Sequence, residues 1–520
     1  MNELAVERLD RRAVVAVARE GARLAPSLPA GVRARVDAAR GHVERIAGGD
    51  SAVYGVTTGF GALATTRISA AQRKELQHAL LRSHAAGAGD FVAPEVVRAM
   101  MAIRAKTLAA GYSGVRAELI EALIRLLNAG VVPAVPEYGS LGASGDLAPL
   151  SHIGLCLCGE GWALDNGRAI PAAQALERAG LEPVELEVKE GLSLINGTDG
   201  MLAMLVLAIA DLECLLDSAD VTAAMTLEAV LGTDRVFRPE LHRIRPHPGQ
   251  TTVAARLLKL LEGSAIMDSH RESAHLVQDA YSLRCTPQVH GAARDTLDFA
   301  VQVAERELAS VTDNPVVLAD GRVESGGNFH GEPLAFALDF LAIAAAEVGA
   351  IAERRIDRLL DAHRSEGLPP FLAPQAGTHS GFMVAHYTAV SLADDNRRLA
   401  TPASVGSLPT SAMQEDHNSM GWSAARKLVR VVDNLNAILA IEALAAAQAL
   451  DLRAPLDPAR ATAAARAAIR AHVAFQAHDR FMAQDIHSLT PLLRQGLLTR
   501  AVAPFMPPTT RSHPDSGGSP

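Results

Sequence analysis

Apolar residues recur at helical spacing along most of the chain, and the clearest stretch runs from Ala424 to Leu450. Aliphatic side chains form one stripe there and charged side chains lie off it, which predicts a helix with one buried face. The same spacing predicts one or two amphipathic helices in residues 1 to about 50 and a helical stretch from about Ala70 to Asn128. The stripe consists of Leu428, Val431, Val432, Leu435, Ile438 and Leu439.

Clusters of Gly, Asn and Pro interrupt this pattern in the second half of the chain. They fall at residues 196–198, 313–315, 326–331 and 368–370, between long helical stretches. No fixed repeat is present, which argues against a solenoid. The pattern therefore predicts a mainly α protein.

A smaller mixed part is expected to precede a large helical part. Residues 1–200 hold Gly-rich loops and, at Asn166-Gly167, a predicted type I′ turn that would close a short hairpin. Residues 201–506 are expected to form the central and C-terminal helices. Residues 507–520 lack apolar content and are expected to form a disordered tail.

Composition limits the classes of partner. The 520 residues are 49% hydrophobic, which is enough to bury a large core. The net charge of -9 and the sequence pI near 6.1 argue against a general nucleic-acid binder, because such a protein presents a basic face. A small-molecule substrate and no nucleic-acid partner are therefore expected.

The chain shows no clear membrane or export signal. The longest membrane-like stretch, Gly200 to Ala210, stops at Asp211 and is well short of the roughly 20 residues that a spanning helix needs. The first residues contain acids and no apolar signal region. We therefore expect a cytoplasmic protein without membrane association.

The four cysteines are too few for a disulfide scaffold in a chain of this length. Cys156 and Cys158 could form half of a metal site, but no second pair of Cys or His stands at ligand spacing. Free thiols and no metal are therefore expected.

The most informative segment, Gly139 to Leu150, reads Gly-Ser-Leu-Gly-Ala-Ser-Gly-Asp-Leu-Ala-Pro-Leu. The amide nitrogen of Gly145 can approach the carbonyl carbon of Ala143, because glycine has no Cβ. Ring closure and loss of water from Ser144 would then leave an electrophilic methylidene carbon. On the alternative reading these small residues form a turn before a helix, with Asp146 in its first turn.

This segment, continued by residues 151–152 and 159–161, resembles the active-site segment of the aromatic amino acid ammonia-lyases. The resemblance spans about residues 5 to 500. It implies that residues 143–145 become a 4-methylidene-imidazole-5-one group, with no external cofactor. It also implies the fumarase/aspartase-like helical lyase architecture, a bundle of long central helices with a smaller mixed N-terminal part. The implied assembly is a homotetramer whose pockets draw on more than one subunit.

Removing ammonia from an amino acid requires an electrophile that engages the substrate and a base that takes the β-proton. Tyr54 heads a segment similar to the family's Tyr-Gly-Val-x-Thr-Gly-Phe-Gly and is implied to be the general base. Tyr281 is implied to assist either the proton transfers or the prosthetic group. Arg284 would hold the substrate carboxylate in two parallel hydrogen bonds, and Gln278 belongs to the same substrate-binding strip. Without the flanking matches, Tyr54 would be a tyrosine at a core edge and Arg284 a surface side chain.

Two more positions match the family on the sequence around them. Asn196 stands where the family places an amide that hydrogen-bonds the prosthetic group or the substrate amine, and Phe329 matches the phenylalanine beside the prosthetic ring. Both precede apolar helical stretches, whose N-termini would favour anionic states by roughly 0.3 to 1 kcal/mol each. By residue type alone, Asn196 would be a turn residue and Phe329 a core residue.

Two other positions indicate which substrate is used. Ser83-His84 resembles the histidine-specific branch of the family, whereas phenylalanine-specific relatives carry an apolar pair there. Glu415, within Gln-Glu-Asp-His, falls where the histidine enzymes place a carboxylate and the phenylalanine and tyrosine enzymes an amide. A carboxylate can accept an imidazole N–H but is costly beside a phenyl ring. The implied reaction converts L-histidine to urocanate and ammonia, the first step of histidine degradation. On the alternative reading, His84 is a core histidine and Glu415 an acid at a helix start.

Four residues depart from the family pattern: Thr57, Asp199, Asn418 and His386. Thr57 and Asp199 are expected to border the pocket, so they weaken the substrate assignment more than the reaction class. A tyrosine or phenylalanine ammonia-lyase, or an aromatic amino acid aminomutase on the same scaffold, is therefore an alternative.

Two readings outside this family are also open. Residues 131–150 could be a strand, loop and helix for a nucleotide phosphate, but they lack both the Gly-Lys-Ser/Thr of a P-loop and the Gly-x-Gly-x-x-Gly spacing. A helical scaffold without catalysis would leave every property intact when Ser144 is replaced by Ala.

Overall fold

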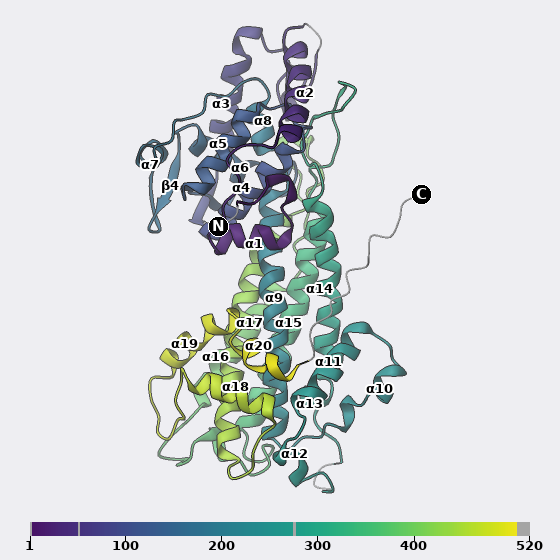
Figure 1. Cartoon of the computed structure of the whole chain (residues 1–520), viewed down its shortest axis with the longest axis vertical. Helices are drawn as coiled ribbons and strands as arrows, with labels where there is room; N and C mark the ends of the chain where they lie inside the picture. The colour runs from purple at the N-terminus through teal and green to yellow at the C-terminus, as the bar shows by residue number, and fades with distance from the viewer. Residues whose placement is uncertain (1–2, 50–51, 274–276, 507–520) are drawn as a thin grey trace. The chain divides into compact units, whose positions relative to one another are not determined.

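The computed structural model describes residues 3–49, 52–273 and 277–506 (Figure 1). Helices account for 61% of the chain and strands for 6%, so the predicted mainly α class is confirmed. The tail at 507–520, expected to be disordered, lies outside the described residues.

The chain folds into two compact units. The first is made of Met1–Ala210, Asp298–Ala342 and Leu399–Arg430. The second is made of Asp211–Leu297, Ile343–Arg398 and Val431–Pro520. The division predicted near residue 200 stays a prediction.

The first unit begins with two amphipathic helices, as predicted for the first fifty residues. α1 (Arg11–Arg19) starts after Asp10, whose side chain accepts a hydrogen bond from the backbone N–H of Ala13 at 2.7 Å. α2 (Ala30–Ala47) follows. The further helices up to residue 195 are α3 (Arg73–His84), α4 (Pro94–Ala109), α5 (Ala117–Asn128), α6 (Leu147–Leu157), α7 (Ala172–Ala179) and α8 (Glu190–Ile195).

The single helical stretch predicted from about Ala70 to Asn128 is wrong, because a strand interrupts it. β1 (Ala88–Phe91) follows α3 and pairs antiparallel with β3 (Pro136–Tyr138). The backbone of Gly89 has a φ of +87°, and a Cβ there would lie 2.7 Å from the ring of Tyr138. The close approach of these strands therefore ends the helix that the apolar spacing predicts.

The predicted hairpin is confirmed. β4 (Trp162–Asp165) and β5 (Arg168–Pro171) pair antiparallel, and β2 (Val132–Pro133) pairs with β4 on its other side. Asn166 and Gly167 have φ values of 49° and 79°, the left-handed conformation that a type I′ turn requires at both central positions. A second small pair joins β6 (Val316–Val317) to β7 (Val323–Glu324).

Four long helices have residues in both units. The stripe predicted on the last of them is confirmed, because all six of its aliphatic side chains are buried. Two of the four are long and apolar enough to cross a membrane, which the apolar spacing of the sequence did not indicate. Their most apolar stretches are 67% and 83% buried, as in the core helices of a folded protein. The four are α9 (Asp199–Ala229), α14 (Thr286–Leu308), α15 (Glu332–Leu360) and α17 (Gly421–Leu452), and the two apolar ones are α15 and α17.

The second unit adds shorter helices around its parts of the long ones. They are α10 (Pro239–Arg243), α11 (Pro248–Leu260), α12 (Ala265–Ser269), α13 (Tyr281–Arg284), α16 (Met383–Leu399), α18 (Arg460–Arg470), α19 (Met482–Arg494) and α20 (Leu497–Val502).

Charged side chains join helices inside the second unit. The buried carboxylate of Asp220, on α9, lies 2.8 Å from Nδ1 of His290 and accepts hydrogen bonds from Arg256 and Arg294. Burial by itself would raise its pKa, but these three basic side chains outweigh burial and lower the pKa of Asp220.

A second buried cluster surrounds Glu442 on α17. Its carboxylate accepts a hydrogen bond from Nη2 of Arg355 at 3.0 Å, and others from the hydroxyls of Thr222 at 2.7 Å and Thr226 at 3.2 Å. These contacts tie α9, α15 and α17 together by side chains alone.

Candidate active site

The Ala143-Ser144-Gly145 tripeptide lies in a loop that leads into α6. Gly145 has a φ of +75°, and a Cβ there would lie 2.1 Å from the carbonyl oxygen of Gly197, so only glycine fits. Gly145 and Gly197 form an isolated parallel β-bridge. The loop therefore lies directly against the segment that carries Asn196.

Asp146 fastens this loop to the start of α9. Its carboxylate accepts hydrogen bonds from the backbone N–H groups of Gly200 and Met201, at 2.8 and 2.9 Å, and from the Ser140 hydroxyl at 2.9 Å. Its own N–H donates to the carbonyl of Gly197 at 2.7 Å. Complete burial raises the pKa of Asp146 to about 7, although these donors partly offset that effect.

Further backbone groups at helix starts hold the other side of the loop. The carbonyl of Gly142 accepts hydrogen bonds from the N–H of Gly331, just before α15, and from the Ser419 hydroxyl, at 3.3 and 3.0 Å. The N–H of Met420, just before α17, donates to Leu141 at 2.8 Å. The N-termini of α6, α9, α15 and α17 therefore meet around the tripeptide, where they favour negative charge.

Glu415, one of the two residues predicted to select the substrate, lies beside the tripeptide. The Ser144 hydroxyl donates to Oε1 of Glu415 at 3.3 Å. Burial lowers the pKa of His84, and a backbone hydrogen bond at Leu80 and the negative charge of Glu415 partly oppose that change. Nδ1 of His84 lies 3.0 Å from the Ser83 hydroxyl.

Tyr54 lies on the Gly-rich loop, half-buried. Its hydroxyl accepts a hydrogen bond from the N–H of Gly61 at 3.1 Å, and its ring meets Phe60 edge to face with 6.4 Å between centroids. A Cβ on Gly61 would lie 3.2 Å from Oγ of Ser411. The Tyr54 loop therefore packs against the turn that precedes Glu415.

Asn196 presents a buried acceptor. Its Nδ2 donates to the carbonyl of Asn314 at 2.6 Å, whereas its Oδ1 has no hydrogen-bond partner among the described residues. An unpaired buried amide oxygen costs free energy unless another group binds it. This oxygen can accept a donor from a prosthetic group or a substrate amine.

Arg104 holds the backbone of Asn196. Residue spacing in the sequence did not predict this role. Its guanidinium donates to the carbonyls of Ser193 and Asn196, at 2.9 and 3.1 Å, and pairs with Asp199. Both charged groups are buried. Burial raises the pKa of Asp199, and Arg104 opposes only part of that rise. Asp199, expected to border the pocket, is therefore an ion-pair partner of Arg104. In the sequence, the indication of this role is the charge of Arg104 within the apolar pattern of α4.

Phe329 is half-buried in the loop before α15. The next residue, His330, stacks on His417 with 5.8 Å between ring centroids and contacts its carbonyl through Nε2 at 3.2 Å. The loop that carries Phe329 therefore reaches the segment that carries Glu415.

The comparisons with known proteins agree with this arrangement. A family model described as aromatic amino acid lyase matches residues 9–471. The chain belongs to the aromatic amino acid lyase family.

Relatives of this lyase include proteins of more than one activity. It is 60% identical over 430 residues to a histidine ammonia-lyase from Streptomyces avermitilis, covering 82% of this chain and 84% of the relative. A histidine ammonia-lyase from Gloeobacter violaceus is 53% identical over 83% of this chain and 84% of its own length. Among solved structures, a tyrosine aminomutase from Streptomyces globisporus matches with a TM-score of 0.91 and 41% identity, over 97% of this chain and 99% of that one. A histidine ammonia-lyase from Trypanosoma cruzi matches with a TM-score of 0.88 and 41% identity, over 96% and 94%.

Three predicted residues of this lyase belong to the second unit. Tyr281 opens α13 with 70% of its surface exposed, and the guanidinium of Arg284 lies over its ring, 4.6 Å from the centroid. Gln278 is exposed just before them. The residues around the tripeptide all belong to the first unit, and the place of these three in the site stays a prediction.

The four cysteines of this lyase are free, as expected. Burial raises the pKa of Cys156 and of Cys158 to about 12, which keeps both thiols protonated at neutral pH. Within the described ranges, no group of three or more His, Cys, Asp or Glu side chains is placed to hold a metal ion.

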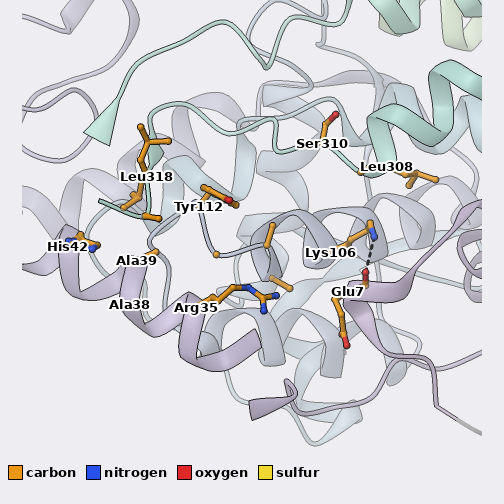
Figure 2. A pocket seen from close by; sticks show the side chains of 16 residues that line it. Glu7, Arg35, Ala38, Ala39, His42, Lys106, Tyr112, Leu308, Ser310 and Leu318 are labelled. Carbon is orange, nitrogen blue, oxygen red and sulfur yellow. Dashed lines mark hydrogen bonds between the residues drawn. The ribbon is translucent and has the colours of Figure 1, made fainter. Parts of the chain in front are cut away.

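A cavity of about 460 Å³ in the first unit is separate from this site (Figure 2). It is lined by Arg35 and His42 on α2, by Lys106 on α4 and by residues 308–310 and 317–319. The Lys106 ammonium donates to the carbonyl of Glu7 at 3.1 Å, and burial lowers its pKa. No residue predicted for catalysis is among the described residues that line this cavity.

Proposed function

We propose that this lyase eliminates ammonia from L-histidine to give urocanate. The observation that carries the proposal is the position of Glu415, whose carboxylate accepts a hydrogen bond from the Ser144 hydroxyl. A charged carboxylate suits a polar imidazole ring and would be costly against phenyl. The 60% identity to a histidine ammonia-lyase supports the same substrate.

The electrophile proposed is a 4-methylidene-imidazole-5-one group made from residues 143–145. The residues present fit it: Gly145 has no room for a side chain, and the free Oδ1 of Asn196 lies on the segment bonded to this loop. Closing the Gly145 nitrogen onto the Ala143 carbonyl carbon expels one water, and dehydration of Ser144 expels a second. Once formed, the group would supply an electrophile that none of the twenty side chains offers.

The other residues would bind and orient the substrate and move its protons. Tyr54 would take the β-proton from a loop that packs beside the turn holding Glu415. His84 and Glu415 would hold the imidazole ring, and the four helix N-termini would favour negative charge as it develops. The N–H of Gly61 donates to the Tyr54 hydroxyl, which fixes the position of that oxygen.

A tyrosine aminomutase activity is the second candidate, because one solved aminomutase is 41% identical over 97% of this chain. The Glu415 carboxylate argues against it, since a phenol ring places less polar surface beside that group.

We also propose a cytoplasmic homotetramer. Tyr281, Arg284 and Gln278 would then face the tripeptide of a neighbouring subunit, with Arg284 binding the substrate carboxylate. The 70% exposure of Tyr281 supports this arrangement, because an interface would cover it. Light scattering of the purified protein tests the assembly, and a monomer with full activity would contradict it.

The substrate proposal is tested by incubating the purified enzyme separately with histidine, tyrosine and phenylalanine. Ultraviolet absorbance reports the unsaturated acid, and chromatography reports any β-amino acid. Histidine should turn over fastest, with urocanate as its product. Faster turnover of tyrosine, or a β-amino acid as the main product, would overturn the proposal.

A further inference from the structure

The turn that carries Glu415 has an unusual backbone. Ser411, Ala412 and Met413 have φ values of 52°, 52° and 69°, three consecutive non-glycine residues in the left-handed region. Such a conformation costs free energy and persists only where the surrounding structure enforces it. Thr410 and Glu415 close the turn by an antiparallel bridge, with N–O distances of 2.9 and 3.3 Å.

The side chain of Thr410 also binds the carboxylate of Glu415. Its hydroxyl donates to Oε2 of Glu415 at 3.1 Å. Because the Ser144 hydroxyl donates to Oε1, one carboxylate oxygen is held within the turn and the other is directed at the tripeptide. The orientation of Glu415 therefore depends on the threonine hydroxyl.

A third residue fixes the direction of that hydroxyl. Nδ2 of Asn418, which is fully buried, donates one hydrogen to the carbonyl of Leu408, and its other hydrogen is shared between Oγ1 of Thr410 and the carbonyl of Glu415, each 3.4 Å away. A hydroxyl has one proton to donate, so accepting from Asn418 leaves that proton for Glu415. Asn418 departs from the family pattern, so this lyase holds its threonine in a way that the pattern does not require.

We infer that Thr410 is a positioning residue for substrate selection: its hydroxyl orients Glu415 so that Oε1 accepts the N–H of an imidazole ring. The inference rests on the proposed histidine activity. Thr410 touches no reacting atom and acts only through Glu415.

Thr410→Val and Thr410→Ser separate the hydroxyl from the shape of the side chain. Thr410→Val is expected to lower kcat/KM for histidine about tenfold, because a charge-assisted hydrogen bond is lost. Thr410→Ser keeps the hydroxyl and should stay within about threefold of wild type. Intact mass, measured on each variant, shows whether the tripeptide has still lost its two waters. If Thr410→Val does not fold, Thr410→Ala replaces it.

A double-mutant cycle with Glu415→Gln distinguishes positioning from a general structural role. Removing the hydroxyl should change kcat/KM much less in the Glu415→Gln background than in wild type, because its partner is already altered. An equal factor in both backgrounds, or equal losses for Val and Ser, would overturn the inference. Failure of the wild-type enzyme to convert histidine would instead overturn the proposed function, and the inference with it.

Discussion

Two buried aspartates show how differently the units use charge. Asp146, in the first unit, is bonded by two backbone N–H groups and one hydroxyl, and its pKa rises to about 7. Asp220, in the second, is surrounded by His290, Arg256 and Arg294, and its pKa is lowered. Neutral donors offset only part of the loss of water around a carboxylate, whereas three basic groups more than offset it.

The difference reflects what each carboxylate holds. Asp146 binds the backbone of a loop and the start of a helix, so it sets the path of the tripeptide. Asp220 binds side chains of other helices, so it fixes how the helices of the second unit pack. Breaking the contacts of Asp146 should therefore reduce activity beyond any loss of folding, and breaking those of Asp220 should reduce stability alone.

The largest effect is expected from Ser144→Ala. Without a side chain that can be dehydrated, histidine turnover should fall by on the order of 10³-fold or more. The urea unfolding midpoint should stay near that of wild type, because residue 144 is only half-buried. Histidine turnover as fast as that of wild type would contradict the proposed electrophile.

Asp220→Asn should produce the largest loss of stability. The largely buried guanidinium groups of Arg256 and Arg294 keep their ion pairs with Asp217 but lose the carboxylate of Asp220, so the free energy of unfolding should fall by about 3–5 kcal/mol. Denaturant unfolding measures this loss, and kcat per folded molecule should not change. A large fall in kcat with normal stability would contradict the contrast between the units.

Asp146→Asn should have a moderate effect on both properties. The amide oxygen can still accept both N–H groups at the start of α9, but the amide nitrogen cannot accept the hydrogen bond from the Ser140 hydroxyl, so stability should fall by about 1–3 kcal/mol. Displacement of the loop should also lower kcat for histidine, by about tenfold. The fraction of molecules that carry the mass deficit should fall with kcat. Full activity in this variant would show that the loop does not depend on the carboxylate.

The smallest effect is a difference in pH dependence. Between about pH 4 and 7 the folded state binds a proton at Asp146 more readily than the unfolded state, so the stability contributed by this group falls as pH rises. Asp220 acts in the opposite direction: its contribution is complete above pH 3.8 and is lost as pH falls through its lowered pKa.

The free energies of unfolding of wild type and Asp146→Asn, measured across this pH range, give the pH dependence of stability that Asp146 contributes. The advantage of wild type over the variant should shrink as pH rises from about 4 to 7. An advantage that grows over the same range would contradict the raised pKa.

Local features of the sequence predicted the helices, the hairpin and the reactive tripeptide. The stripe on α17 and the Asn166-Gly167 turn each depend on neighbouring residues, so periodicity and turn chemistry were enough to find them. The helix predicted across residues 88–91 failed because strand pairing with β3, a distant contact, overrode local spacing.

The long-range contacts that hold the site residues in place could not be predicted from local sequence features. Asp146 meets Gly200, 54 positions away, and Arg104 meets Asn196, 92 positions away. Such contacts depend on the folded arrangement of loops, and a single sequence carries no periodic signal for them. Residue types and a family resemblance named the reacting groups, but only the structure showed what orients them.

The most direct test of the account is the intact mass of freshly purified, folded protein. The account predicts a mass below that of the sequence by two water molecules, with the deficit located in the peptide that holds residues 143–145 and absent from Ser144→Ala. A mass equal to that of the unmodified chain, in protein that converts histidine to urocanate, would contradict it.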